Sequence, residues 1–311
     1  MAVCMLLALA VCSACGPREP AAPAAAKAPA PAAAAPATVR IPPGAQEFRT
    51  DHYAIFSTAP ARQTVQVATA VEALYRAYDR FFELPVAPAD AERLKLILYR
   101  NKTQFSDYNT SMPWAEAFYR KPYCHAYYAV DTDNPYHWML HEATHQLNAE
   151  RIAGTPVAKA KWINEGLATY FGSSRLDNAQ LLPGRIDPQA YPIWRLDNLP
   201  LSGSLQRDLG AGQLIALRKV IDGSGPPIGG RYLNTYYIEY WSLSHFLFHY
   251  RDGQYAQAYR RLIRGDGSLR EFEAAIGPIE QVQEQWYDHL VTLQAQLRMG
   301  DQAVPATPIA R

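Results

Sequence analysis

The segment HEATH, residues 141–145, places two histidines and a glutamate close together on one expected helix. Because His141 and His145 are four residues apart, their imidazoles project from the same helical face, one turn from each other. This spacing lets both histidines bind a single tetrahedral zinc ion, and Glu142 can reach a water molecule there as a general base. Such a site needs a third ligand, and the position of that ligand constrains the fold.

The residues after HEATH indicate where the third ligand comes from. One known arrangement continues as HExxHxxGxxH, but Asn148 and Arg151 stand at the corresponding positions. Another arrangement takes a glutamate from the following helix, and Glu165 lies 20 residues after His145. A turn around residues 154–156 would make the two helices antiparallel and return Glu165 to the level of the histidines. We therefore predict a zinc site formed by both histidines and Glu165, with its fourth position open to water.

The pattern of apolar residues changes character near residue 134. Before it, strand and helix patterns alternate, with strands expected at 52–58, 94–100 and 125–130 and helices at 63–83 and 102–111. After it, helices dominate, at about 134–152, 159–171, 212–221, 235–251, 254–264 and 279–298, with a long loop at 173–205. Asn134-Pro135 is a typical helix start, with an Asn cap before a proline.

This order predicts an α+β fold in one domain, residues 47–300. A small α/β part, residues 47–133, would contribute a mixed sheet packed on the HExxH helix, and residues 134–300 would form a mainly helical part. Hydrophobic residues make up 49% of the chain, enough for a sizeable core. Lysine and arginine number 30 against 29 aspartates and glutamates, and this balance argues against a nucleic-acid-binding surface.

The first residues resemble a secretion signal. A short apolar run at residues 3–14 ends in small residues before Cys15, as in bacterial lipoprotein signals, so we expect a signal peptide at residues 1–15 with cleavage before Cys15. No basic residue precedes the run, and Cys12 stands where leucine is usual. Cleavage before Cys12, an ordinary secretory signal and a misassigned start therefore remain open. The run is too short to span a membrane, which leaves a lipid anchor as the expected membrane contact.

An Ala/Pro-rich stretch, residues 16–46, follows the signal, and a short tail, residues 301–311, ends the chain. Repeated proline blocks helix formation, so we expect a disordered spacer that lifts the domain off the membrane, or simply a disordered terminus. The expected location is the bacterial cell envelope, as an outer-membrane lipoprotein facing the periplasm, or alternatively as a soluble secreted or periplasmic protein. Cys124 would be a single buried thiol, because no disulfide framework is possible.

HEATHQL followed by WINEGLATYF resembles the gluzincin metallopeptidases, the thermolysin-like clan, and most of all the bacterial peptidase-MA-like proteins of the DUF1570 type. The similarity extends to YIEYWSLSHFL at 237–247 and covers roughly residues 48–295. It implies a zincin-like fold, one zinc ion per chain held by His141, His145 and Glu165, and hydrolysis of a peptide or protein substrate.

The resemblance also implies a residue that stabilises the oxyanion of the transition state. Tyr237 matches the tyrosine of the family's Tyr-x-x-x-Trp helix, while Tyr236, Tyr240 and His245 remain competitors. One departure concerns the partner of a ligating histidine. Thermolysin-like enzymes often place an aspartate four residues after the ligand glutamate, and Thr169 stands there instead.

Two other interpretations of the function stay open. An inactive lipoprotein with the same fold could serve as a binding module or scaffold, and a zinc hydrolase could cleave a non-peptide amide. The second histidine pair, His245 and His249, has no glutamate beside it and is interpreted as packing, and Trp138 is interpreted as part of the core. The sequence carries no signal for the oligomeric state.

Overall fold

The structure is a computed structural model that describes residues 39–112, 115–131, 134–152 and 160–299. The predicted signal peptide, the tail and most of the predicted spacer lie outside this range. The described residues from Arg40 onward belong to one compact unit. None of the helices in the described ranges combines the length and the apolar character that a membrane crossing requires.

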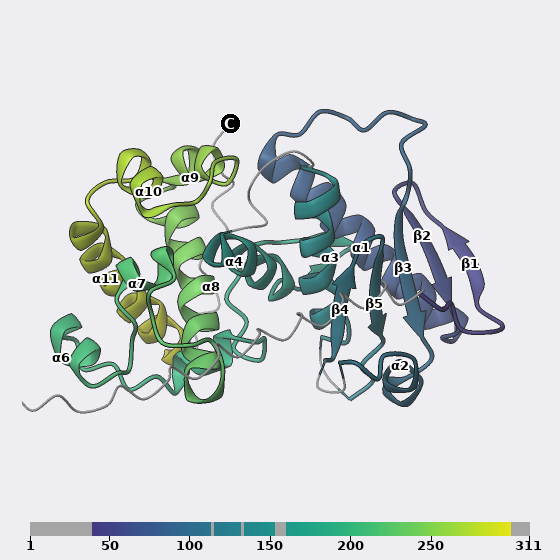
Figure 1. Cartoon of the computed structure of the whole chain (residues 1–311), viewed down its shortest axis with the longest axis horizontal. Helices are drawn as coiled ribbons and strands as arrows, with labels where there is room; N and C mark the ends of the chain where they lie inside the picture. The colour runs from purple at the N-terminus through teal and green to yellow at the C-terminus, as the bar shows by residue number, and fades with distance from the viewer. Residues whose placement is uncertain (1–38, 113–114, 132–133, 153–159, 300–311) are drawn as a thin grey trace, which may run out of the picture. The chain divides into compact units, whose positions relative to one another are not determined.

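Five strands form a mixed sheet in the order β1-β2-β3-β5-β4 (Figure 1). The three central strands are parallel, and the two edge strands run antiparallel to their neighbours. The strands are β1 (Gln46–Arg49), β2 (Tyr53–Ser57), β3 (Leu94–Tyr99), β4 (Ala117–Arg120) and β5 (Tyr123–Tyr127). The chain is thus a mixed α/β protein with a mixed sheet, as predicted at that level.

The sheet is covered on both faces, because its central strands alternate two sets of buried side chains. Leu96, Leu98 and Cys124 belong to the main core together with residues of α1 and α3. The neighbouring Tyr99 and His125 point the other way, where the ring of Phe105 in α2 packs 5.5 Å from Tyr99. Cys124 is a buried free thiol, as predicted.

The helices account for most of the remaining chain. The larger ones are α1 (Ala61–Phe82), α3 (His137–Glu150), α4 (Lys161–Gly172), α8 (Leu233–His249) and α11 (Ile279–Arg298). The short ones are α2 (Lys102–Tyr108), α5 (Ile193–Asp197), α6 (Leu205–Gly210), α7 (Leu217–Asp222), α9 (Ala256–Leu262), α10 (Leu269–Ala275) and the 3-10 turn η2 (Gly230–Tyr232). A small hairpin, β6 (Leu176–Asp177) and β7 (Gln180–Leu181), follows α4.

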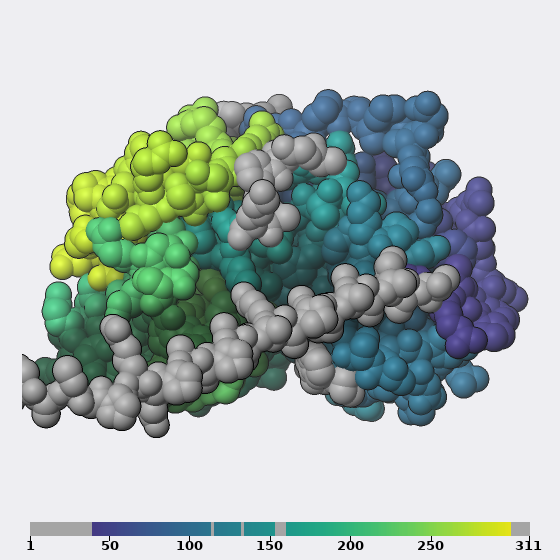
Figure 2. Space-filling model, viewed as in Figure 1, coloured from purple at the N-terminus to yellow at the C-terminus, as the bar shows by residue number. Residues whose placement is uncertain are grey.

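Helix α4 lies between α3, which packs on β4 and β5, and α8, which packs on α5, α9 and α11. The middle of the compact unit is therefore a three-helix stack that joins the sheet to the C-terminal helices. In Figure 2 the purple and blue residues of the sheet and the yellow residues of the last helices occupy different regions of this unit. Helix α8 is buried along most of its length and carries the fully buried Trp241.

Several predicted boundaries are wrong. Helix α3 begins at His137 after Tyr136, two residues later than expected. Asn134 does not cap it: its Oδ1 accepts no hydrogen bond from the described residues, and its Nδ2 donates to the Ser174 carbonyl. Two edge strands, β1 and β4, were missed, and the strand expected at 125–130 lies at 123–127. The expected loop at 173–205 contains α5 and a hairpin. Of the helix expected at 212–221, only the last part is helical, as α7.

Candidate metal centre

Helices α3 and α4 bring together the three predicted ligands. The Nε2 atoms of His141 and His145 lie 3.2 Å apart. Glu165 Oε2 lies 3.5 Å from Nε2 of His141 and 3.6 Å from Nε2 of His145. These atoms form a nearly equilateral triangle, and within the described ranges no other set of three His, Cys, Asp or Glu residues converges in this way.

The triangle has the dimensions that a tetrahedral zinc site requires. Zinc bonds of about 2.0–2.1 Å imply about 3.3–3.4 Å between neighbouring ligand atoms, and the three distances here are 3.2, 3.5 and 3.6 Å. Glu165 Oε2 is also buried without a hydrogen-bond partner among the described residues. Because a buried unpaired carboxylate oxygen is costly, a cation at the centre of the triangle would satisfy it. The group can therefore hold a metal ion.

The electrostatic balance of the group favours positive charge. Burial by itself would raise the pKa of Glu165, but the neighbouring rings of His141 and His145 lower it well below its usual range. Burial would likewise lower the pKa of His145, yet Glu165 and Glu142 raise that pKa to about 9. A carboxylate that stays ionised, beside a histidine that readily takes up a proton, is suited to binding a cation.

Two glycines of α4 allow this helix to pack closely against α3 and α8. A Cβ atom on Gly172 of α4 would lie 3.0 Å from the Cβ of His141 and 3.1 Å from its backbone nitrogen. A Cβ on Gly166 would lie 2.4 Å from the Ser244 hydroxyl oxygen and 3.0 Å from the Tyr240 carbonyl oxygen in α8. Sequence reasoning missed this role, although two glycines in an otherwise helical pattern were a usable signal.

Glu142, the predicted general base, lies between the metal group and the edge strand β4. Its Oε2 accepts a hydrogen bond of 2.9 Å from the backbone nitrogen of Tyr119. The Tyr119 hydroxyl donates over 3.0 Å to Glu150, two turns further along the same helix. The edge strand, which sequence reasoning did not find, therefore holds the side of α3 that carries Glu142.

Tyr237 lies closer to the metal group than two of its competitors. Its ring centre is 6.3 Å from that of His141, and burial, followed by the nearby Glu165 carboxylate, raises its pKa. Tyr236 instead donates its hydroxyl to the Pro226 carbonyl oxygen over 2.6 Å. His245 is bonded to His289 and to the Gly184 carbonyl. Tyr240 remains a neighbour, since Glu165 also acts on its pKa.

The Nδ1 atoms of His141 and His145 are buried, and neither has a hydrogen-bond partner among the described residues. Thr169 does not supply one, because its hydroxyl donates to the carbonyl oxygens of Glu165 and Gly166 in its own helix. Metal-ligating histidines usually donate their outer N–H to an acceptor, which fixes the ring orientation. Among the described residues, this group therefore lacks the outer hydrogen-bond acceptor that usually fixes the rings of metal-ligating histidines.

The second histidine pair lies elsewhere and is built differently. His245 Nδ1 lies 3.0 Å from His289 Nε2, and His249 Nε2 lies 2.7 Å from the Tyr170 hydroxyl. Burial lowers the pKa of His249 and of His289 to about 4. These rings are neutral packing groups, in agreement with the interpretation of His245 and His249.

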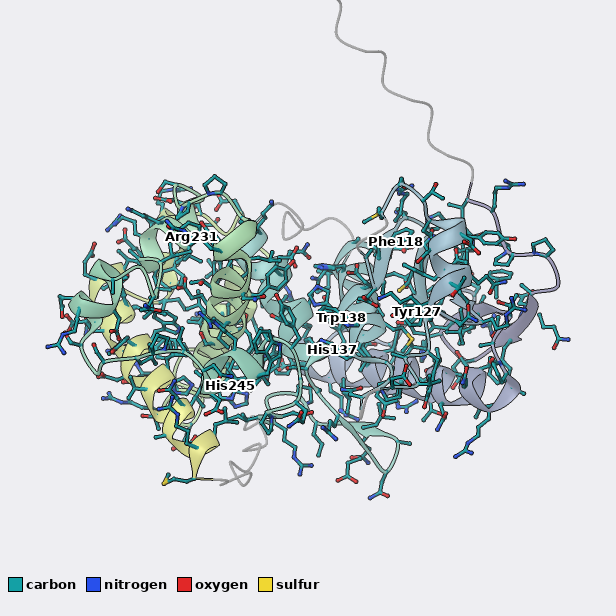
Figure 3. The ribbon with its side chains drawn as sticks, turned by 90° about the horizontal axis from the view of Figure 1, so that it is seen from below. Phe118, Tyr127, His137, Trp138, Arg231 and His245 are labelled. Carbon is teal, nitrogen blue, oxygen red and sulfur yellow. The ribbon has the colours of Figure 1, made fainter. Side chains whose placement is uncertain are left out.

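Trp138 is only half buried, so its expected place inside the core is wrong in part. Its ring lies 6.5 Å from that of His141 and 5.1 Å from that of Tyr191. Figure 3 labels Trp138 and the adjacent His137 between the strands that carry Phe118 and Tyr127 and the helices near His245. Trp138 thus belongs to the surroundings of the metal group.

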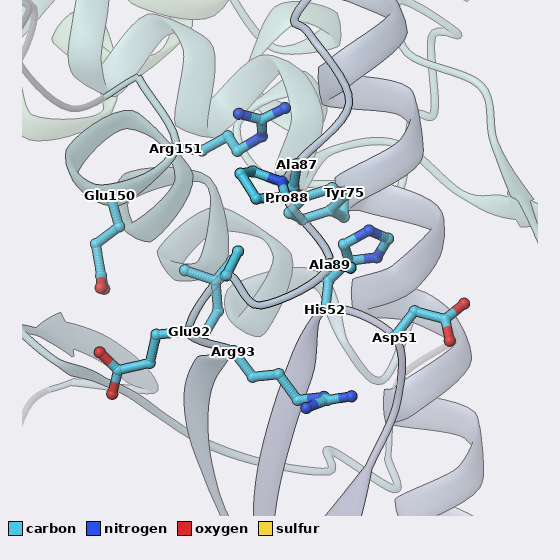
Figure 4. A pocket seen from close by; sticks show the side chains of 12 residues that line it. Asp51, His52, Tyr75, Ala87, Pro88, Ala89, Glu92, Arg93, Glu150 and Arg151 are labelled. Atoms are coloured by element: carbon cyan, nitrogen blue, oxygen red, sulfur yellow. The ribbon is translucent and has the colours of Figure 1, made fainter.

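A cavity of about 350 Å³ lies at the C-terminal end of α3, beside Glu150 and Arg151 (Figure 4). Several of its charged side chains already have partners within the protein. His52 is bonded to Glu72 over 2.8 Å, and Arg151 forms an ion pair of 3.0 Å with Asp79. The lining residues include none of the three members of the metal group.

The fold and the site together define a mixed α/β protein with a His₂Glu group that can hold a metal ion. Protein-family models and curated proteins were compared with the chain, and none matches it. The function is therefore argued from the site itself.

Proposed function

We propose that the chain is a zinc-dependent peptidase of the cell envelope with a zincin-like fold. The observation that carries this proposal is the triangle of His141 Nε2, His145 Nε2 and Glu165 Oε2, whose sides of 3.2 to 3.6 Å suit one tetrahedral zinc ion. Three protein ligands leave a coordination position for water or substrate, as in catalytic zinc sites. Glu142, next to the first ligand on α3, supplies the carboxylate that such hydrolysis needs.

A zinc ion bound here would act as a Lewis acid, polarising the scissile carbonyl and making a water molecule more acidic. Glu142 accepts the proton of the attacking water and later delivers it to the leaving amine. The Tyr119 backbone N–H binds one carboxylate oxygen of Glu142, and this contact orients the other oxygen for proton transfer. A fixed orientation matters because general bases act only within hydrogen-bond distance of the proton.

Tyr237 is proposed to stabilise the oxyanion. Its side chain comes from α8 and lies beside His141. Burial and the Glu165 carboxylate raise its pKa, so the phenol keeps its proton at neutral pH and can donate a hydrogen bond to developing negative charge. Removing one oxyanion donor typically lowers kcat by about 10²–10³-fold.

The first test compares the wild type with Glu142→Gln. We expect both proteins to bind about one zinc ion, whereas hydrolysis of a broad peptide library falls by about 10²–10⁴-fold in the variant, the usual contribution of a general base. Glu150→Gln is the matched control, because Glu150 lies on the same helix and contacts the same strand residue, Tyr119. The control should retain most of the activity.

The outcomes separate the remaining interpretations. Full activity in Glu142→Gln would contradict the role of Glu142 as general base. Zinc binding without cleavage of any peptide would favour the scaffold lipoprotein, or a hydrolase for another amide if such amides are cleaved in a parallel screen. The peptidase is favoured because the Glu142 carboxylate lies next to the ligand His141, and its bond to Tyr119 engages only one of its two oxygens.

The envelope location is proposed from the N-terminal segment alone. If Cys15 is the lipidated residue, the wild type incorporates labelled palmitate in a bacterial host, and Cys15→Ala does not. Cys12→Ala serves as the control and should be labelled normally. Labelling that is lost only in Cys12→Ala would indicate cleavage before Cys12. No labelling in the wild type would favour a soluble secreted or periplasmic protein.

A further inference from the structure

Four aromatic side chains form a continuous cluster beside the metal group. We call Trp138, Tyr191, Trp194 and Tyr237 the aromatic cluster. Tyr191 lies at its centre, with ring-centre distances of 5.1 Å to Trp138, 6.3 Å to Trp194 and 5.5 Å to Tyr237. Trp138 and Tyr237 each contact the ligand His141, at 6.5 and 6.3 Å. The cluster therefore begins at a metal ligand.

The cluster is assembled from three parts of the chain and reaches solvent. Trp138 comes from α3, Tyr237 from α8, and Trp194 from α5, with Tyr191 just before it. Trp194 is 39% exposed, and the other three side chains are only half buried. Core aromatics elsewhere in the chain, such as Trp162 and Trp241, are at most 1% exposed. Packing alone therefore leaves part of the aromatic surface uncovered.

A single exposed tryptophan would need no explanation, since isolated apolar residues are common on surfaces. Here the exposed Trp194 continues a set of rings that leads directly to His141. A ligand held at the metal group would extend along these rings if it carried a large apolar substituent. Aromatic side chains prefer offset or edge-to-face contacts with ring centres 4.5–7 Å apart. The rings of the cluster already form such contacts with one another, so a ligand ring would pack on their uncovered surface, of which Trp194 exposes the most.

We propose that the aromatic cluster is the subsite for an aromatic side chain of the peptide substrate, adjacent to the bond that is cleaved. Trp194 and Trp138 are its specificity-determining residues. This inference rests on the proposed function, because it takes the metal group as the place where the substrate is held. It names the substrate class of that site: peptides with phenylalanine, tyrosine or tryptophan next to the scissile bond.

The test measures ligand binding, so that it does not depend on turnover. Propanohydroxamate and 3-phenylpropanohydroxamate share a metal-binding head group and differ by one phenyl ring. Their affinities for the zinc-loaded chain are measured by calorimetry for the wild type, Trp194→Ala and Trp194→Phe. Tyr108→Ala is the control, because Tyr108 is similarly exposed, at 37%, but lies in α2 on the far face of the sheet.

We expect the phenyl ring to improve the affinity of the wild type about tenfold. Trp194→Ala should reduce this preference by about three- to tenfold, the range of a single aromatic pair, without changing the affinity for propanohydroxamate. Trp194→Phe should restore most of the preference, and Tyr108→Ala should leave it unchanged. Restoration by phenylalanine distinguishes a ring contact from a general disturbance of α5.

Equal affinity of the wild type for the two hydroxamates would overturn the subsite. An unchanged preference in both Trp194→Ala and Trp138→Ala would also overturn it. Failure of the proposed function looks different: the ring preference and its loss in Trp194→Ala would persist, but no peptide would be cleaved. If peptides are cleaved, the library digest should show aromatic residues enriched next to the cleaved bond in the wild type and less so in Trp194→Ala.

Discussion

The two histidine clusters of this chain share a helical spacing and differ in everything that surrounds it. His141 and His145 are four residues apart on α3, and His245 and His249 are four residues apart on α8. Glu165 of a neighbouring helix faces the first pair within 3.6 Å of both rings. The second pair instead faces His289, a tyrosine hydroxyl and a backbone carbonyl.

Helical spacing of two histidines is therefore not enough to make a metal site. A carboxylate raises the pKa of His145 to about 9, whereas burial lowers the pKa of His249 to about 4. The first environment therefore stabilises positive charge, and the second one excludes it. The helix that supplies Glu165 distinguishes the two clusters more clearly than the motif does.

The largest expected effect is on metal binding. His145→Gln removes one of three ligands, so zinc affinity should fall by more than the roughly 10–100-fold that loss of an outer hydrogen-bond partner costs. His249→Gln is the matched control and should still bind about one zinc ion with unchanged affinity. Zinc affinity is measured by competition with a chromogenic chelator. Equal losses in the two variants would erase the distinction between the clusters.

A second prediction uses pH, because the two clusters should affect stability with opposite signs. The folded-state pKa of His249 is about 4, below its ordinary value near 6.5, so between these values the unfolded state binds more protons. The free energy of unfolding should therefore fall as the pH falls from 6.5 to 4, by about 3 kcal/mol for this group. His249→Gln should remove its share of this acid-side loss, while His289, whose pKa is also about 4, keeps its own.

In the metal-free protein the sign reverses for His145. Its folded-state pKa of about 9 lies above the ordinary value, so its contribution is fully present below pH 6.5 and is lost as the pH rises through 9. His145→Gln should remove this alkaline-side change. Urea unfolding in the presence of a chelator, from pH 4 to 10, measures both slopes. A single shared pH profile for the two variants would contradict the assignment of opposite charge states.

The smallest expected effect tests how the first cluster is positioned. Gly172→Ala would place a methyl group about 3 Å from the backbone of His141, so we expect a loss of about 1–3 kcal/mol in the free energy of unfolding and weaker zinc binding. Gly210→Ala, at the end of α6, meets no atom within 4 Å and is the matched control. Thermal unfolding and zinc titration compare the two. Unchanged zinc affinity in Gly172→Ala would show that close packing at this point does not position the ligand.

The convergence of His141, His145 and Glu165 was predictable because two rules act together. Helical geometry places the histidines on one face, and similar lengths of chain before and after the predicted turn bring Glu165 back to their level. The predicted turn itself, around residues 154–156, lies outside the described residues. Helix α11 begins and ends where its apolar periodicity predicted, at Ile279–Arg298. Regular, long, strongly amphipathic segments leave little freedom for alternatives.

Other features depend on tertiary contacts that periodicity does not record. Strand β1 has four exposed residues, and β4 has only four residues, so neither produces an alternating pattern of useful length. The predicted start at Asn134 was wrong because the helix begins two residues later, at His137, and Asn134 contacts the Ser174 carbonyl through Nδ2 without capping through Oδ1. The aromatic cluster was missed because Tyr191 and Trp194 lie in a segment without regular periodicity, far in sequence from His141.

The central claim is that three side chains hold one metal ion and leave one position for solvent or substrate. Crystals of the zinc-loaded chain, with diffraction recorded on both sides of the zinc absorption edge, test it most directly. We expect one anomalous peak within about 2.0–2.2 Å of His141 Nε2, His145 Nε2 and a Glu165 carboxylate oxygen, with a non-protein ligand in the fourth position. A peak elsewhere, or a fourth ligand from the protein, would contradict it.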